Sequence, residues 1–394
     1  MAEVKKEMEE KKRIQEDYSQ WKKTAPVLYD MVITHNLTWP TLTCQWLPTK
    51  ESTDGCIKQE LLIGTHTNDE EDNYAQILEM DIPQKNSKQA EEKTRMHITQ
   101  KMCHEGEVNK ARYQPHQPNI FATKTRDGDV LVFDRAQTSP ILRLKGHTME
   151  GYGLAWNPHA AKKNHLLSAG FDNTVCHWDI GLAPNSDREL QPYQRYEGHT
   201  GCVEDVSWNS ANDSIFASVA DDMKLKIWDC RDPVKAVQSV QAHEAEVNTV
   251  AFHPTKDWMI ATGSSDKTVG LFDIRKIDNK LHSMELHEGE VTQVSWSPHD
   301  EPILASAGTD RRIVIWDLRH IGEEQTPEDA EDGPPEIMFV HSGHTSRISD
   351  FSWNPHDRWV LASAAEDNVV QVWQMSRNIY ANTDFLEVAS SQLE

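Results

Sequence analysis

Residues 199–228 read HTGCVEDVSWNSANDSIFASVADDMKLKIW, and the spacing within this stretch recurs along the chain. It contains His199, an aromatic residue nine positions later at Trp208, a hydroxyl group at Ser218, an acid at Asp222 and a second aromatic residue at Trp228. Five other segments carry the same kinds of residue in the same order. The histidine and aspartate of the six segments are His104 and Asp127, His147 and Asp172, His199 and Asp222, His243 and Asp266, His287 and Asp310, and His344 and Asp367. Six copies of one register indicate a structural unit that is repeated along the chain.

The length and local pattern of the repeat indicate the fold. Successive repeat histidines are 43, 52, 44, 44 and 57 residues apart, and a period of about 40–45 residues is typical of WD40 β-propeller blades. Short β-rich segments such as 225–228 and 313–316 are predicted strands of these blades. The two longer intervals place insertions at residues 181–196 and 320–342, where we expect loops.

The segment before the first marked repeat bears on the number of blades. Residues 37–82 lack the histidine and aspartate markers, yet they contain three predicted strands, at 42–47, 60–65 and 74–80. We therefore expect an all-β fold, a seven-bladed WD40 propeller in which an N-terminal strand closes the ring against the last repeat. A six-bladed ring with a separate hairpin is the alternative.

The Ser/Thr, His and Asp of each repeat could also be interpreted as a site of nucleophilic catalysis. An enzyme needs one such site with an oxyanion hole beside it, whereas this chain has six equivalent copies. We expect each set to form a buried, hydrogen-bonded tetrad with the second aromatic residue, in which each bond contributes about 1 kcal/mol. No catalytic residue is predicted; the alternative is an enzyme built around one triad, such as the one containing Ser306.

Composition limits the classes of partner. The 394-residue chain has a net charge of −23, which argues against direct binding to nucleic acid and favours a basic partner. The sequence has no apolar run long enough to span a membrane, and its N-terminus is charged, unlike a signal peptide. The six cysteines form no CxxC pair and there is no phosphate-binding loop, so we predict no metal and no cofactor. A reducing compartment, the cytosol or the nucleus, fits this cysteine pattern best.

Acidic residues recur at one position of the repeat. The residue three positions after each repeat histidine is Glu107, Glu150, Cys202, Glu246, Glu290 and Arg347 in turn. Equivalent residues of a propeller lie at equivalent radii, so the four glutamates are expected to circle one opening of the central channel. Glu204, Asp221 and Glu366 are expected near the same rim. Such a ring could hold an extended peptide rich in Lys and Arg; the alternative is an acidic rim that serves solubility.

Two further segments lie outside the repeats. Residues 3–23 are helix formers with an apolar stripe at Ile14, Tyr18 and Trp21, and Pro26 marks the predicted end of the helix. Residues 323–336 contain seven acids and no base, which is typical of an irregular loop that either binds a partner or serves as a solvated linker. We expect an N-terminal helix in residues 1–30 on the side of the propeller, a propeller in 31–376 and a short C-terminal helical tail in 377–394.

Several segments resemble the retinoblastoma-binding histone chaperone family of WD40 proteins. The likeness covers nearly the whole chain and is carried by residues 21–23, 28–30, 39–40, 45–48, 64–67, 105–109, 150–154, 203–206 and 323–336. The resemblance implies a non-enzymatic histone-binding adaptor in the nucleus, and also in the cytoplasm. It implies that the chain is a monomeric subunit shared by chromatin-assembly, deacetylase, remodelling, acetyltransferase or Polycomb complexes.

The resemblance also implies two binding sites. The channel face would bind the N-terminal tail of histone three through Glu107, Asn109, Glu150, Tyr152, Glu204, Asp221, Asn248, Glu290 and Glu366. A side groove between the N-terminal helix and the acidic loop would bind the first helix of histone four, or helices of complex partners. Its residues would be Trp21, Val27, Leu28, Tyr29, Glu328, Asp329, Asp332, Ile379 and Tyr380.

The sequence departs from the family pattern at a few places. Thr292 stands where family members commonly carry an aromatic residue, Lys110 and Arg347 replace the usual Arg and Lys, and segment 83–103 is shorter than usual. The departures at the channel face bear on the affinity for the tail. Two other functions stay open. Residues 228–231, 272–275 and 316–319 resemble the WDxR box by which substrate receptors bind a cullin ligase adaptor, and a generic scaffold without histone contact is the second.

Overall fold

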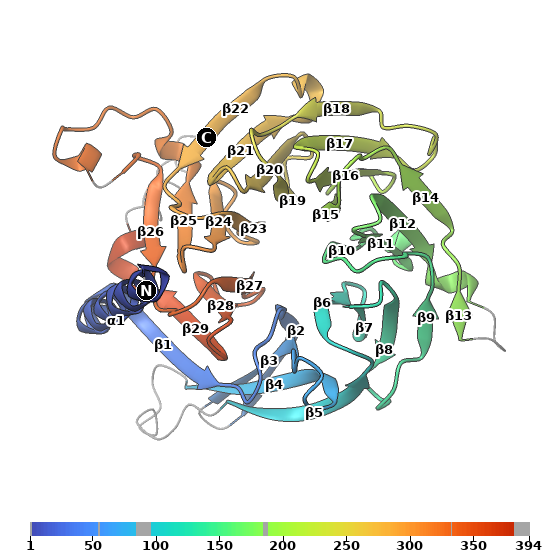
Figure 1. Cartoon of the computed structure of the whole chain (residues 1–394), viewed down its shortest axis with the longest axis horizontal. Helices are drawn as coiled ribbons and strands as arrows, with labels where there is room; N and C mark the ends of the chain where they lie inside the picture. The colour runs from blue at the N-terminus through green and yellow to red at the C-terminus, as the bar shows by residue number, and fades with distance from the viewer. Residues whose placement is uncertain (1, 54–55, 84–95, 184–187, 332, 382–394) are drawn as a thin grey trace.

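The computed structural model describes residues 2–53, 56–83, 96–183, 188–331 and 333–381. In these residues the strands form seven sheets, which are arranged in a ring around one axis (Figure 1). Each sheet is one blade with its first strand nearest the axis, so the prediction of a seven-bladed propeller is confirmed. The six-bladed alternative is wrong.

The strands are assigned to the blades as follows. Blade 1 contains β2 (Cys44–Thr53), β3 (Cys56–Gly64), β4 (Asn73–Pro83) and β5 (Met96–His104). Blade 2 contains β6 (Val108–Gln114), β7 (Gln117–Thr125), β8 (Val130–Asp134), β9 (Leu142–Leu144) and β13 (Glu189–Leu190). Blade 3 contains β10 (Leu154–Trp156), β11 (His165–Ala169), β12 (Thr174–Asp179) and β14 (Gln194–Glu197). Blade 4 contains β15 (Val203–Trp208), β16 (Ile215–Ala220), β17 (Lys224–Asp229) and β18 (Gln238–Gln241).

The remaining blades complete the ring. Blade 5 contains β19 (Val247–Phe252), β20 (Met259–Ser264), β21 (Thr268–Asp273) and β22 (Lys280–Glu285). Blade 6 contains β23 (Val291–Trp296), β24 (Ile303–Gly308), β25 (Ile313–Asp317) and β26 (Ile337–His341). Blade 7 contains β27 (Ile348–Trp353), β28 (Val360–Ala365), β29 (Val369–Met375) and β1 (Tyr29–Asn36). Short 3-10 helices lie at η1 (Ala160–Lys162), η2 (Ile180–Leu182), η3 (Ile274–Lys276), η4 (Leu318–His320) and η5 (Asp329–Glu331).

The core lies between the blades. Val219 and Leu225 of blade 4 pack with Val250 and Phe252 of blade 5, and each of the other blade pairs has a similar apolar layer. Since both faces of a blade are covered by its neighbours, the middle strands are buried throughout rather than alternating. Strand β24, for example, is buried at every residue.

The first and last parts of the chain share one sheet. Strand β1 pairs antiparallel with β29, with Val32 opposite Trp373 and Thr34 opposite Gln371. Blade 7 therefore draws its outer strand from the N-terminal region, as predicted. The three strands predicted within residues 37–82 correspond to β2, β3 and β4, and β5 is the fourth strand of blade 1.

Neighbouring blades are also joined by hydrogen bonds beside the first repeat aromatic. Trp208 Nε1 donates to the carbonyl oxygen of Ala155 at 3.0 Å, toward the preceding blade. In the opposite direction, His159 Nε2 lies 3.2 Å from the carbonyl oxygen of Asn209. Equivalent histidine bonds join His116 to Pro158, His253 to Glu301, His299 to Asn354 and His356 to Pro48. The sequence analysis overlooked this second set of histidines, although a Pro-His pair follows the aromatic residue at 115–116, 158–159, 298–299 and 355–356.

Helix α1 (Ala2–Leu28) packs on the side of the ring at blades 6 and 7 (Figure 1). Trp21 is buried there, and Asp17 pairs with Arg311 at 3.3 Å. The prediction that Pro26 ends the helix is wrong by two residues. Proline lacks one backbone donor, and in the last turn this costs a single helical bond, so the helix continues to Leu28. Residues 377–381 are helical, and 382–394 lie outside the described residues.

The two insertions contain more regular structure than expected. In the first, η2 is followed by β13, which pairs in parallel with β9 and adds a fifth strand to blade 2. In the second, η4 and η5 precede β26, and the segment projects outward from the ring (Figure 1). Thr326 caps the turn at η5 by accepting a hydrogen bond from the Asp329 backbone at 3.2 Å.

Candidate functional site

The repeat markers form hydrogen-bonded tetrads between neighbouring blades. His199 Nδ1 donates to Asp222 at 3.0 Å, and His199 Nε2 lies 2.7 Å from Ser218 Oγ. Trp228 Nε1 donates to the same Ser218 oxygen at 2.8 Å. The same contacts join His147 with Asp172, His243 with Asp266, and His287 with Asp310. Each of these aspartates also accepts a hydrogen bond from the backbone N–H after the histidine, so the loop before a blade is tied to a turn within it.

Two of the six predicted tetrads are incomplete. In the first, Asp127 is exposed and His104 Nδ1 instead lies 2.9 Å from the carbonyl oxygen of Gly106. The assignment of Asp127 to a tetrad is therefore wrong, because a nearby backbone acceptor takes its place. In the last, His344 Nδ1 is 3.8 Å from Asp367, which accepts instead from the hydroxyl of Thr345 at 2.8 Å.

The environment of the tetrads explains why they are structural. The Ser218 and Ser306 side chains are fully buried, and both oxygens are occupied by His and Trp ring nitrogens. Burial lowers the pKa of His147 to about 4 and also that of His199, so the rings are neutral at pH 7. A fully buried hydroxyl of this kind cannot meet a substrate.

The inner strands share a β-bulge at the mouth of the channel. In β15 the pairing shifts between Val203 and Asp205, which leaves Glu204 as the extra residue. Four other inner strands shift at the same point. The extra residues are Asn109, Glu204, Asn248, Thr292 and Ser349. A bulge redirects a side chain away from the regular alternation, and here it places a row of mostly polar side chains at one end of the channel.

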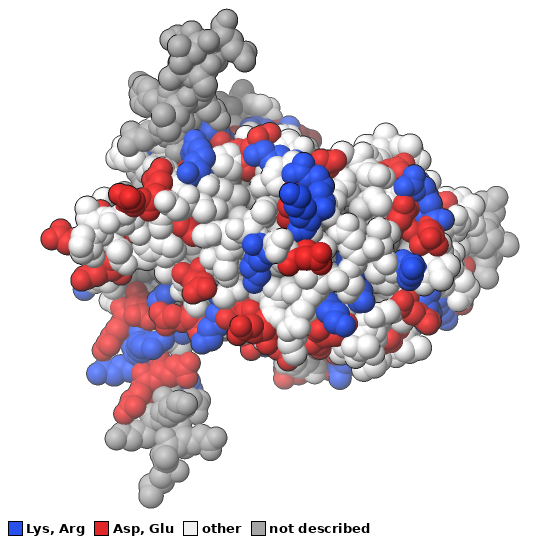
Figure 2. Space-filling view, turned by 90° about the horizontal axis from the view of Figure 1, so that it is seen from above, with Lys and Arg blue, Asp and Glu red and all other residues white. Residues whose placement is uncertain are grey.

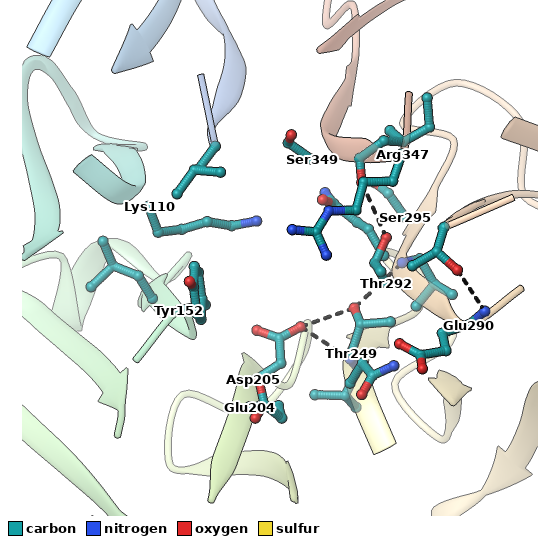
Figure 3. Close-up of a pocket in the computed structure, with 18 of the residues that line it drawn as sticks. Lys110, Tyr152, Glu204, Asp205, Thr249, Glu290, Thr292, Ser295, Arg347 and Ser349 are labelled. Atoms are coloured by element: carbon teal, nitrogen blue, oxygen red, sulfur yellow. Dashed lines mark hydrogen bonds between the residues drawn. The ribbon is translucent and has the colours of Figure 1, made fainter. Parts of the chain in front are cut away.

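A cavity of about 520 Å³ lies at this mouth (Figure 3). Five of the nine residues predicted to bind a tail line it: Tyr152, Glu204, Asn248, Glu290 and Glu366. Asn248 donates to the carbonyl oxygen of Val291 at 2.9 Å, which fixes its amide. Glu290 is exposed at the rim, so its carboxylate is available to a guest.

The other four predicted tail residues lie around the cavity rather than in its lining. Asn109 is buried and donates to Glu150 at 3.1 Å, so it orients that carboxylate. Glu107 is also mostly buried and pairs with His66 at 3.1 Å. Asp221 is hydrogen-bonded to Glu204. We infer that Asn109 and Glu107 shape the acidic rim more than they would touch a guest.

The acids at the mouth are close enough to perturb one another. Burial, followed by the charges of Asp221 and Asp205, raises the pKa of Glu204 to about 8. Burial also raises the pKa values of Asp205 and Asp221. Burial and the charge of Glu150 raise the pKa of Tyr152 to about 12. Glu204 therefore holds a proton at pH 7 when no cation is beside it.

The cavity also contains cations and a buried acid that were not predicted as site residues. Arg112 Nη1 donates to Asp350 at 3.0 Å, and Lys110 Nζ lies 3.3 Å from the same carboxylate. Asp350 in turn accepts from the Cys44 backbone at 2.8 Å, which links blade 7 to blade 1. Asp205 does the same for the Val250 backbone at 3.0 Å. A signal existed, since Lys110, Asp205, Thr249, Gln293 and Asp350 all stand three residues before the repeat aromatic.

The second predicted surface, on the side of the ring, is only partly exposed. Val27 and Leu28 are 76% and 37% exposed, and the acids Glu328 and Asp329 are exposed on the loop. Ile379 is half-buried. Asp332 lies outside the described residues.

Three residues predicted to touch a partner at this surface are buried instead. Trp21, Tyr29 and Tyr380 are each 8% exposed. Trp21 Nε1 donates to the Tyr29 hydroxyl at 3.0 Å, and that hydroxyl bonds His341 Nδ1 at 2.8 Å. Tyr380 stacks on Trp359 with the ring centroids 5.0 Å apart. As side chains that hold α1 and the C-terminal segment to blade 7, they can support a binding surface but contribute little to direct contact.

The three Arg-containing motifs have a local structural role. Arg231, Arg275 and Arg319 each bond the aspartate two residues earlier, at 2.6–2.7 Å. These pairs lie at the turn that follows the third strand of a blade, and nothing in their geometry favours an adaptor interface.

Surface charge and the remaining side chains restrict other kinds of site. On the edge of the ring seen in Figure 2, Lys and Arg side chains are interspersed with Asp and Glu. Among the described residues, no group of three or more His, Cys, Asp or Glu is arranged to hold a metal ion. No described helix combines the length and apolar character needed to cross a membrane.

Comparison with known families gives two matches. A model described as WD domain, G-beta repeat, matches residues 138–179, 190–229, 234–273, 278–317 and 336–374, about half of the chain. A model described as histone-binding protein RBBP4, or a subunit of the CAF1 complex, matches residues 16–84. The second match spans the end of α1, the closing strand β1 and most of blade 1. The repeat matches omit the strands β6, β7 and β8, which lie beside the incomplete tetrad of His104.

Proposed function

Given that this chain belongs to the WD40-repeat family of histone-binding proteins that includes RBBP4 and the corresponding subunit of the CAF1 complex, we propose that it is an adaptor with two histone sites. One site binds the N-terminal tail of histone three at the channel mouth, and the other binds the first helix of histone four on the side of the ring. The family is non-enzymatic, and chromatin-assembly, deacetylase, remodelling or Polycomb-type complexes in the nucleus are the proposed setting.

The channel mouth supports the first site through charge and shape. The cavity of about 520 Å³ can admit one or two side chains of an extended peptide, and Glu290, Glu366 and Glu204 face it. A Lys or Arg side chain entering the cavity could lie beside the ring of Tyr152, where a cation gains up to about 1–2 kcal/mol. The acidic wall would also attract the tail from a distance, with an effect that falls as salt rises.

The side surface supports the second site through a combination of apolar and acidic groups. Val27 and Leu28 at the end of α1 provide exposed apolar area, and Glu328 and Asp329 provide charge on the loop. A basic amphipathic helix fits such a surface. The match of residues 16–84 to the histone-binding family model includes the end of α1.

The observation that carries the proposal is the acidic channel mouth, whose bulged inner strands present side chains from five blades to one cavity. Titration calorimetry against two peptides tests it: the histone-three N-terminal tail and the histone-four first helix, each at low and high salt. Glu290→Lys places a cation at the channel mouth, and Glu328→Lys/Asp329→Lys does so on the loop. Both changes are at exposed residues, so the fold should be retained.

Each charge reversal should weaken one peptide at least about tenfold and leave the other within about twofold. Loss of both peptides in either variant would show that the two sites are not independent. Failure of a well-folded parent protein to bind either peptide would contradict the proposed function.

A further inference from the structure

The channel mouth contains a cation of the protein itself. Arg347 precedes the inner strand β27, and its side chain is 60% exposed. Its Nε atom lies 2.5 Å from a carboxylate oxygen of Glu366, and the Glu366 backbone N–H donates to the Arg347 carbonyl oxygen at 3.2 Å. Arg347 is therefore held to the rim by two contacts with one residue.

The guanidinium group points into the cavity. Figure 3 shows the side chains of Arg347 and Lys110 extending from opposite walls toward its middle. Lys110 is paired with the buried Asp350, but within the described residues Glu366 is the one carboxylate paired with Arg347. Its position near Tyr152 and Glu290 means that it also interacts with the two other groups best placed to receive a cation.

The neighbouring residue leaves room for this arrangement. Thr292 is the bulged residue of β23, and its hydroxyl donates to the carbonyl oxygens of Ala307 and Ile348 at 3.3 and 3.4 Å. The side chain is short and turned toward the backbone, so it does not compete for the space that Arg347 occupies.

We propose that Arg347 is a resident cation that competes with the basic guest for Glu366 and Glu290, and so limits the affinity of the channel mouth for Lys- and Arg-rich peptides. This inference rests on the proposed function. A guest cation must either displace Arg347 from Glu366 or bind beside an acid that is already partly neutralised. Arg347 thereby selects for guests that carry more than one cation, because a second charge compensates for the displaced one.

The test is a neutral substitution of similar length. Arg347→Gln leaves Glu366 and Glu290 without their resident partner, and the histone-three tail peptide should bind about three- to tenfold more tightly at low salt. The gain should shrink at high salt, since it is electrostatic. Arg347→Lys keeps the charge and should bind within about twofold of the parent.

A matched control separates this local effect from a change in net charge. Arg126 is 54% exposed and pairs with Asp69 at 3.0 Å, away from the cavity lining. Arg126→Gln removes the same charge and should change the affinity by less than about 1.5-fold. Thermal unfolding of each variant should stay close to that of the parent, because both side chains are largely exposed.

The outcomes separate the inference from the proposed function. If the parent binds the tail and Arg347→Gln binds no more tightly, or more weakly, Arg347 is not a competitor and the inference is overturned. If neither protein binds the peptide at any salt concentration, the proposed function and the inference both fail. Binding by Arg347→Gln but not by the parent would support the inference in its strongest form.

Discussion

At the scale of single residues, Glu204 combines two roles. As the bulged residue of β15 it faces the cavity, and its carboxyl group bonds that of Asp221. Burial and two acidic neighbours raise its pKa from 4.5 to about 8. Because the folded pKa lies above the unfolded value, Glu204 contributes stability fully below about pH 4.5, and that contribution is lost as the pH rises through about 8.

The Glu204→Gln variant should therefore resist alkaline conditions better than the parent protein. Between pH 5 and pH 9 the parent should lose on the order of 1–3 kcal/mol more unfolding free energy than the variant, an amount reduced from the full linkage value because the side chain is partly solvated. Denaturant unfolding at a series of pH values measures this difference.

A control for this prediction lies at the other end of the molecule. The hydroxyl of Thr255 lowers the pKa of Glu301, so Glu301 is ionised in both the folded and the unfolded state across this range. Glu301→Gln should leave the alkaline slope of the parent unchanged. Equal slopes for Glu204→Gln and the parent would show that Glu204 is ionised when the channel is empty.

The sequence predicted the residues of this site unevenly. Repeat equivalence was enough to place Glu290 and Glu366 on one rim, because equivalent positions lie at equivalent radii. It did not reveal that Asn109 would be buried, nor that Lys124 in the next strand would be fully enclosed with a pKa lowered to about 8 by burial. Such burial depends on how two blades meet, and no local pattern in the sequence records that.

At the scale of elements, the turn after each repeat aspartate has an unusual backbone conformation. The residue after the aspartate has a positive φ at Gly128, Asn173, Met223, Lys267, Arg311 and Asn368. Only glycine and asparagine are common in this region of φ. The sequence therefore signalled the left-handed turn at three of these positions and concealed it at Met223, Lys267 and Arg311.

Lys267→Gly should stabilise the protein. Lys267 has a φ of 73° and an exposed side chain, so glycine would remove the backbone strain without loss of packing. The gain should be about 0.5–1 kcal/mol, measured by denaturant unfolding. Lys224→Gly, at the start of β17, is the matched control and should destabilise by a similar amount, since glycine in a strand costs conformational entropy. A loss of stability in Lys267→Gly would mean that its side chain makes a contact that outweighs the strain.

The bulges of the inner strands show a further limit of sequence-based prediction. The alternation of β15 would place Glu204 in the same row as Val206, yet the bulge gives Glu204 an independent direction. A register that shifts by one residue reverses the face on which a side chain lies. Acidic residues at the mouth could be predicted from the repeat, but their directions required the structure.

At the scale of the whole molecule, the ring is closed by pairing residues from opposite ends of the chain. Asn36 at the end of β1 lies opposite Val369 at the start of β29. The equivalent pair in blade 4 is Gln241 and Lys224, which are close in sequence. The two pairs occupy the same place in their blades and differ in the length of chain that they enclose.

A disulfide at each of these pairs should therefore stabilise the fold to different extents. Asn36→Cys/Val369→Cys closes a loop that contains most of the chain, and this should contribute more than about 4.7 kcal/mol in the chain-entropy view, against about 3 kcal/mol for the short loop of Lys224→Cys/Gln241→Cys. Unfolding in denaturant with and without reductant gives both values. Equal stabilisation would indicate that blade 7 remains assembled in the unfolded reference state.

The shared sheet of blade 7 also has a consequence for the order of synthesis. A ribosome releases β1 long before β29, so the first strand must wait for a partner that emerges near the end of translation. During that interval the growing chain can stack blades 1 to 6 one after another, but it presents two open sheet edges that invite association with other chains. The side surface at α1 and blade 7 is assembled last, which means that a nascent molecule cannot offer it to a partner before the ring has closed.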